Sequence, residues 1–137
     1  MHLLILHIAT IFGGAERTTS NLLDHLDRRY VQRITVVAPA ALRQHLPDNY
    51  HQFIATDVYG ISGNFSTWKA LYQDARALSG LFRDQAADVA LGMMHYSSAL
   101  LVLGTRLAGI KTKTIASYRG PFYEYMRYYE PAWRRRL

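Results

Sequence analysis

The sequence contains no cysteine among its 137 residues. This absence excludes a disulfide framework, a thiolate metal site and a cysteine nucleophile, and it agrees with a reducing cytosol. Acidic residues are also scarce, with 10 Asp and Glu against 16 Lys and Arg, which leaves a formal net charge of +6. An excess of positive charge favours phosphate, nucleotide or anionic lipid partners. We therefore expect a cytoplasmic protein whose partners carry negative charge.

Long hydrophobic runs are missing as well. The apolar stretches at residues 1–9 and 97–103 are far shorter than the roughly 20 residues that span a bilayer, and the first lacks the basic start of a signal peptide. Half of the residues are nevertheless apolar and only 19% are charged, which supports a buried core. The length allows one compact domain and leaves little room for a second.

Hydrophobic periodicity switches repeatedly along the chain and predicts strands that alternate with helices. Such alternation favours right-handed crossovers and a doubly wound, mainly parallel Rossmann-like α/β sheet in the order 3-2-1-4-5, with helices on both faces. Ligands of such sheets lie beyond the carboxyl ends of the strands, beside the first strand. The predicted strands are residues 3–9, 34–38, 51–55, 89–92 and 112–117, and the predicted helices are residues 15–28, 40–46, 66–85 and 97–108.

A glycine pair, Gly13 and Gly14, joins the first strand to the first helix. Glycine lets the backbone approach a ligand closely, and the N-terminus of a helix offers free N–H donors, so the pair suits a phosphate group. The competing interpretation is a tight turn without a ligand. The position after the central strand favours the phosphate site.

Two common phosphate-binding motifs do not fit this turn. A dinucleotide fingerprint requires a third glycine and an acidic residue near the end of the second strand, which here ends in Ala38 and Pro39. A P-loop requires a Gly-Lys pair, and the sequence contains none. NAD binding and nucleoside triphosphate hydrolysis are therefore disfavoured.

Three groups of segments, in order along nearly the whole chain, resemble family 4 retaining glycosyltransferases, which have the GT-B fold. The first is Gly13-Gly14-Ala15-Glu16-Arg17 with Asn21-Leu22-Leu23 after it. The second and third are Ala87-Asp88-Val89-Ala90-Leu91, and Leu107-Ala108-Gly109-Ile110-Lys111 followed by Thr114-Ile115-Ala116-Ser117-Tyr118-Arg119-Gly120.

The resemblance implies a hexosyl-type enzyme that transfers a sugar from a nucleotide sugar to a glycan or lipid-linked acceptor, as in polysaccharide or glycolipid biosynthesis. The family uses two Rossmann-like domains that face each other across a cleft, and residues 1–137 would form the N-terminal, acceptor-side half of this architecture. The C-terminal domain, which holds the donor nucleotide through an E-x7-E motif, is not found in this sequence. We therefore expect this chain to be a truncated domain that is inactive alone and associates with itself or with the missing half.

The resemblance also assigns roles to particular residues. Many family members carry a histidine after the fifth strand, whereas this sequence has Ser117-Tyr118-Arg119-Gly120, similar to a subgroup with Ser-Glu-Arg-Asn. Arg119 would bring charge to a diphosphate or an acceptor phosphate, with a structural arginine as the alternative. His95 would be a cleft residue, with a capped helix start as the alternative. Gly13 and Gly14 are assigned to the donor diphosphate, Arg119 and His95 to catalysis, and Arg17, Tyr96 and Tyr118 to the acceptor side of the cleft.

The remaining acidic residues and histidines do not suggest another site. Glu16 and Asp24 form an E-x7-D pattern on the first helix, where we expect solvent-facing side chains rather than a donor motif. His2 and His7 fall on opposite faces of one strand, and no metal-binding histidine spacing occurs. We expect no metal and no cofactor, with the nucleotide sugar as co-substrate.

The segment from Pro121 onward interleaves aromatic residues with arginines. This composition suits the surface of an anionic membrane, so we expect peripheral contact with the inner face of a membrane; nucleic acid binding is not expected, because no recognised binding module is present. The competing interpretation is a helix whose aromatic residues are buried. The alternative function for the whole chain is a non-catalytic domain that binds an anionic ligand or a membrane lipid.

Overall fold

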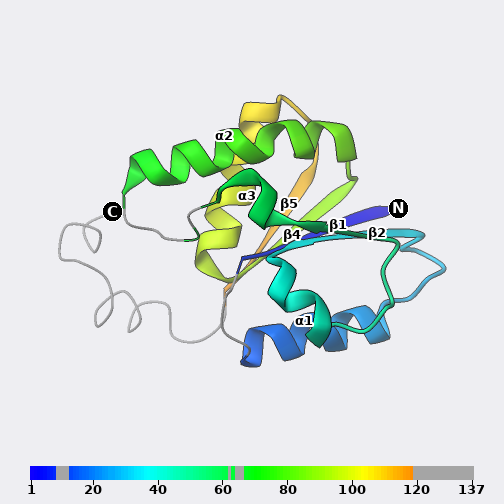
Figure 1. The fold of residues 1–137 in the computed structure, drawn as a ribbon. Helices are drawn as coiled ribbons and strands as arrows, with labels where there is room; N and C mark the ends of the chain where they lie inside the picture. The colour runs from blue at the N-terminus through cyan, green and yellow to red at the C-terminus, as the bar shows by residue number, and fades with distance from the viewer. Residues whose placement is uncertain (9–12, 62, 64–66, 119–137) are drawn as a thin grey trace.

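The computed structural model describes residues 1–8, 13–61, 63 and 67–118. These residues form an α/β fold in which a five-stranded, all-parallel sheet lies between layers of helices (Figure 1). The strand order is β3-β2-β1-β4-β5, as the sequence predicts. The strands are β1 (His2–His7), β2 (Arg33–Ala38), β3 (Gln52–Ala55), β4 (Val89–Met93) and β5 (Lys113–Ser117).

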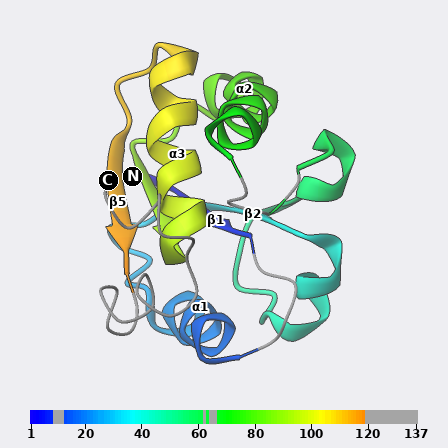
Figure 2. The ribbon, with the colours of Figure 1, turned by 90° about the vertical axis from the view of Figure 1, so that its left-hand side faces the viewer.

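Helices cover both faces of the sheet, as predicted (Figure 2). The helix α1 (Gly14–His25) lies on one face, and α2 (Trp68–Gln85) and α3 (Met94–Ala108) lie side by side on the other. Two short 3-10 helices, η1 (Ala40–His45) and η2 (Thr56–Tyr59), flank β3.

The central strand β1 supplies side chains to both cores because successive residues of a strand point to opposite faces. Leu3 and Ile5 pack beneath α1 with Leu23, while Leu4 and Leu6 pack beneath α2 and α3. The near-continuous apolar run of β1 is therefore the pattern of a parallel strand buried on both faces.

The helix ends follow from local chemistry. Thr67 caps α2, because its side-chain oxygen accepts the N–H of Ala70 at 3.1 Å. Gly109 adopts the left-handed conformation that ends α3, with φ of 68°. Ala86 ends α2 in the same conformation without being glycine, with φ of 42°.

Several details differ from the prediction. The helix α3 begins at Met94 rather than at residue 97, and α1 ends at His25 rather than at residue 28. The helix α2 begins at Trp68 rather than at residue 66, and Trp68 keeps 55% of its surface exposed. The edge strand β5 is exposed through Lys113 to Ala116.

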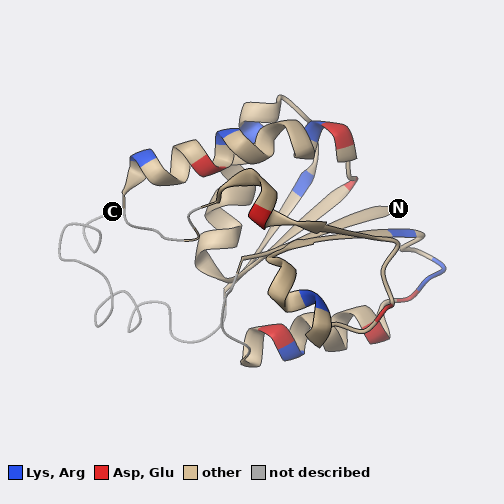
Figure 3. Ribbon diagram, in the orientation of Figure 1, with Lys and Arg blue, Asp and Glu red and all other residues tan. Residues whose placement is uncertain are grey.

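Acidic and basic residues both occur along α1 and along α2 (Figure 3). Within the described ranges, no helix is long and apolar enough to cross a membrane. The aromatic and basic segment from Pro121 onward lies outside the described residues, as does Arg119.

Candidate functional site

The point where the sheet changes winding direction lies between β1 and β4. From β1 the chain continues to α1 on one face, and from β4 it continues to α3 on the opposite face (Figure 2). The carboxyl ends of these two strands are adjacent, with His7 beside Met93 in the register. Ligands of open parallel sheets bind at such a position. The residues that surround it form the candidate site.

The glycine pair stands at one side of this edge, at the N-terminus of α1. Gly13 precedes the helix and Gly14 is its first residue. Neither position has a left-handed backbone. Gly14 is exposed, and beyond its chain neighbours and its own helix no atom of the described residues lies within 4 Å of the place where a Cβ would stand. Among the residues that the structure describes, neither backbone geometry nor packing requires glycine at position 14.

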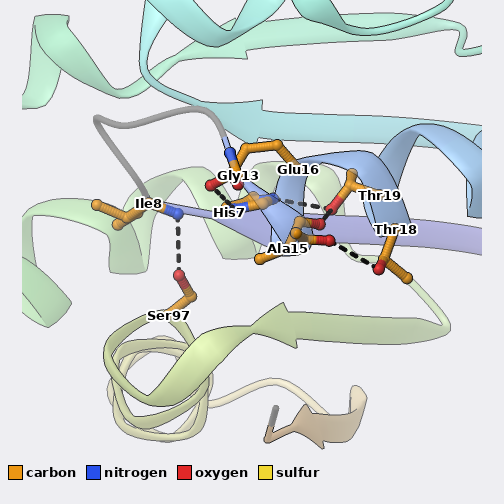
Figure 4. A network of polar contacts seen from close by, with 9 residues as sticks. His7, Ile8, Gly13, Ala15, Glu16, Thr18, Thr19 and Ser97 are labelled. Carbon is orange, nitrogen blue, oxygen red and sulfur yellow. Dashed lines mark hydrogen bonds and ion pairs between the residues drawn. The ribbon is translucent and has the colours of Figure 1, made fainter. Parts of the chain in front are cut away.

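A buried polar network contacts the turn that precedes α1 (Figure 4). The N–H of Gly13 donates to Glu16 Oε2 at 2.7 Å, and Glu16 Oε1 lies 3.1 Å from His7 Nε2. His7 Nδ1 lies 2.8 Å from the hydroxyl of Thr19. His7 and Thr19 are fully buried, and Glu16 is only 3% exposed. The network ties the end of β1 to the first turns of α1.

The expectation that Glu16 faces solvent is therefore wrong. As the third residue of α1, Glu16 folds back to accept the N–H of the residue before the helix, as acidic residues at this position often do. Its buried partner is His7, a residue that the sequence pattern did not mark as part of the site. Two signals could have revealed the pair: a histidine in a run otherwise fit for a buried strand, and the three-residue spacing from Gly13 to Glu16.

The junction of β4 and α3 forms the other side of the edge. No loop separates the two elements, and Met94 takes a φ of 69°, which is rare for a residue with a side chain. Gly92 permits this close approach, because a Cβ there would stand 2.6 Å from the Cα of Ser98. Backbone strain of this kind is concentrated at functional sites.

Two of the predicted site residues meet at this junction. The rings of His95, on α3, and Tyr118, after β5, are tilted against each other with centroids 5.2 Å apart. Tyr118 keeps 54% of its surface exposed, while His95 is half-buried. Arg17 is exposed on the first turn of α1.

Tyr96 has a different environment. Its hydroxyl donates a hydrogen bond to Asp74 of α2, and its ring packs against the core between α2 and α3. Asp74 is only 5% exposed, which adds a second buried acid to the one found in α1. Both buried acidic residues lie on helices, Glu16 on α1 and Asp74 on α2.

Among the parts of the chain that the structure describes, no group of three His, Asp or Glu side chains could hold a metal ion. At the carboxyl edge the described residues offer backbone N–H groups, the buried His7 and Glu16 pair, and the rings of His95 and Tyr118.

Comparison with known proteins found no matching family model, no matching curated sequence and no matching solved structure. The functional interpretation therefore depends on the site itself and on the sequence resemblance.

Proposed function

We propose that this chain is the acceptor-side domain of a retaining glycosyltransferase with GT-B architecture, and that the turn before α1 receives the diphosphate of the nucleotide sugar. The proposal combines the resemblance in sequence with the position of Gly13 and Gly14 beside the switch point of the sheet. Its acceptor is a glycan or a lipid-linked glycan, and its second domain supplies the binding site for the donor nucleotide.

The observation that carries the proposal is the glycine at position 14. Glycine is a weak helix former that costs up to about 1 kcal/mol relative to alanine inside a helix, and Gly14 is the first residue of α1. Within the described part of the chain, its φ is not positive and a Cβ would contact nothing beyond its chain neighbours and its own helix. Close approach of a ligand to the backbone is the reason that we propose for glycine at this position.

The turn offers chemistry suited to a departing diphosphate. The first N–H groups of a helix have no partner within the helix and carry the positive end of its dipole. In sugar transfer, the bond from the anomeric carbon to the diphosphate oxygen breaks, and the acceptor hydroxyl forms a new bond to that carbon and loses its proton. Donors aimed at the diphosphate stabilise the negative charge that develops on the leaving oxygen.

The other side of the edge suits the acceptor. Arg17 lies one turn into α1, and the exposed ring of Tyr118 offers a flat apolar surface with a hydroxyl, as sugar rings require. The ring of His95 contacts the ring of Tyr118 and borders the same surface. Tyr96 is less suited to this role, because its hydroxyl already donates to Asp74.

Binding of pyrophosphate, which represents the diphosphate of the donor, tests the proposal by calorimetry on three proteins. The wild type and Gly80→Ala should bind alike, since Gly80 lies in α2 with open space around it. Gly14→Ala should bind at least about tenfold more weakly, because a methyl group would stand where the ligand approaches the backbone. Equal affinity for all three proteins, or no binding at millimolar concentration, would contradict the proposal.

Activity provides a second arm of the same test. The chain alone should transfer no sugar from a labelled donor to any acceptor, because the residues that hold the donor nucleotide belong to the other domain. Transfer by the purified 137-residue chain would show that a second domain is unnecessary and would overturn the two-domain assignment.

A further inference from the structure

The outer edge of β5 carries backbone groups that no strand among the described residues binds. In the order of the sheet β5 is an edge strand beside β4, and Figure 2 shows it at the margin of the fold. Its residues from Lys113 to Ala116 are all exposed, whereas β3 at the opposite edge is half-buried from Phe53 to Ala55. An exposed edge of this kind is a template on which another strand can pair.

The contact between β5 and β4 shows which backbone groups of β5 face outward. The N–H of Lys113 donates to the carbonyl oxygen of Asp88 at 3.1 Å, so the backbone of Lys113 faces the sheet. Backbone groups alternate in direction along a strand, and those of Ile115 therefore face the sheet as well. The N–H and C=O groups of Thr114 and Ala116 face the open edge.

An apolar side chain lies at the centre of this edge. Ile115 keeps 52% of its surface exposed, although it is the middle residue of β5. In the register it lies beside Leu91, a half-buried residue that packs against the core on the α1 face of the sheet. A further strand along β5 would cover Ile115 and extend this apolar face.

We propose that β5 pairs with the β5 strand of a second copy of this chain, antiparallel and centred on Ile115, so that two five-stranded sheets join into one. In this arrangement Ile115 lies opposite the partner's Ile115. Thr114 lies opposite the partner's Ala116, and Lys113 lies opposite the partner's Ser117. The inference does not depend on the proposed function.

The direction of the backbone groups selects this register. Thr114 and the partner's Ala116 both face the edge, so they can exchange two N–H···O=C bonds as a hydrogen-bonded pair of an antiparallel ladder. Such pairs alternate with pairs whose backbone groups face away from each other, and Ile115 has that orientation. A shift of the axis by one residue would pair Thr114 or Ala116 with itself and leave the other beyond the end of the partner's β5.

The side chains suit the same register. The two Ile115 residues form a non-hydrogen-bonded pair, in which facing side chains are closest. Like charges directly opposite each other destabilise a sheet, but each Lys113 lies opposite an uncharged Ser117. The two lysines are four residues apart along the strands, roughly 14 Å at about 3.4 Å per residue. The edge is therefore complementary to itself, which favours a second copy of this chain as the partner.

Pairing in this way leaves the candidate site open. The two β5 strands run in opposite directions, so the carboxyl edges of the two sheets lie on opposite sides of the dimer. The arrangement has twofold symmetry, the commonest symmetry of protein dimers. Each carboxyl edge stays accessible to a ligand or to another domain.

The register can be read from single introduced cysteines, because the chain contains none of its own. Under mild oxidation Ile115→Cys should form a disulfide-linked dimer, since each cysteine would lie opposite its own copy. The control is Val58→Cys on η2, where the side chain is 79% exposed and lies outside the sheet. It should form at least about tenfold less dimer, because cysteines that are not held close together are not bridged.

A second pair of cysteine variants tests the antiparallel direction. Lys113→Cys and Ser117→Cys should each give little disulfide alone, because each residue is distant from its own copy in this register. A mixture of the two variants should form a mixed disulfide, because Lys113 lies opposite the partner's Ser117. Absence of the mixed disulfide would overturn the register.

Sedimentation velocity over a series of concentrations measures the association of the wild type. A single pair of edge strands makes a small interface, so we expect a dimer that dissociates on dilution. Ile115→Lys places like charges opposite each other and removes the apolar contact, and it should weaken dimerisation by at least about tenfold. Val58→Lys should associate as the wild type does. Circular dichroism should show native folding for both variants, because both side chains are exposed.

Three results would overturn the proposal. The first is a wild type that stays monomeric at every concentration. The second is a dimer that Ile115→Lys leaves intact, because association would then use another surface. The third is an equal yield of disulfide from Ile115→Cys and Val58→Cys, because collision alone would then account for the bond.

Discussion

The backbone N–H of Ile8 donates a hydrogen bond to the hydroxyl of Ser97 at 2.9 Å, which fastens the first turn of α3 to the end of β1 (Figure 4). The two residues are 89 positions apart in the chain and meet at the switch point of the sheet. Since His7 binds α1 on the opposite face, the end of β1 is held from both sides. This attachment keeps the carboxyl edges of β1 and β4 at a fixed separation.

Ser97→Ala should lower the free energy of unfolding by about 0.5–1.5 kcal/mol, because the partly buried N–H of Ile8 loses its hydrogen bond to the buried Ser97 hydroxyl. Urea denaturation measures the change. The matched control is Ser79→Ala, whose hydroxyl bonds to the carbonyl of Arg76 within α2 near the surface. That variant should change stability by less than about 0.5 kcal/mol, and an equal loss in both would contradict the role given to Ser97.

Gly92→Ala should destabilise the fold by about 1–3 kcal/mol or more, because the new Cβ would stand 2.6 Å from the backbone of Ser98. Backbone atoms of a packed helix cannot turn aside as a flexible side chain can. Gly80→Ala should instead stabilise the protein by about 0.5–1 kcal/mol, since it adds a helix-favouring residue in open space. Thermal unfolding of the two variants would refute the account if their shifts had the same sign.

His2 predicts a dependence of stability on pH. Burial, followed by the nearby Arg33, lowers the pKa of His2 below its ordinary value of 6.5. The unfolded chain therefore binds more protons than the folded chain in the window just below pH 6.5, so stability should fall as the pH falls through this window. His2→Gln should flatten that fall in urea unfolding experiments, and an unchanged slope would contradict the prediction.

Tyr96→Phe should lower stability by about 1.5–3 kcal/mol, because the buried carboxyl group of Asp74 loses the hydroxyl that donates to it. The matched control is Tyr72→Phe on the same helix as Asp74, where the side chain is 47% exposed. Chemical denaturation should show little change for Tyr72→Phe. A neutral effect of Tyr96→Phe would mean that the contact with Asp74 contributes no net stability.

The strands of the sheet and the helices that cover it could be predicted because they follow from hydrophobic periodicity and composition. The apolar run after Met1 predicts a strand buried on both faces, and the apolar spacing from Leu71 to Phe82 predicts the helix that covers it. The predicted ends of helices and strands were less accurate, because they depend on local tertiary contacts. The start of α3 at Met94 depends on a strained φ and on Gly92, which periodicity cannot reveal.

The candidate site was predictable only in part. The glycine turn has a motif, and the contact between His95 and Tyr118 follows from the adjacent carboxyl ends of β4 and β5. The burial of Glu16 was not predicted, because a charged residue in the first turn of a helix ordinarily faces water. Its burial depends on a partner from another element, which a single sequence does not show.

The most direct test of the central claim is the response of backbone amides to pyrophosphate in two-dimensional NMR spectra. We predict that the amide signals of Gly14 and Ala15 move most, that those of the α2 residues stay in place, and that Gly14→Ala suppresses the response. The largest shifts at the amino ends of the strands, or an undiminished response in Gly14→Ala, would contradict a diphosphate site at the turn before α1.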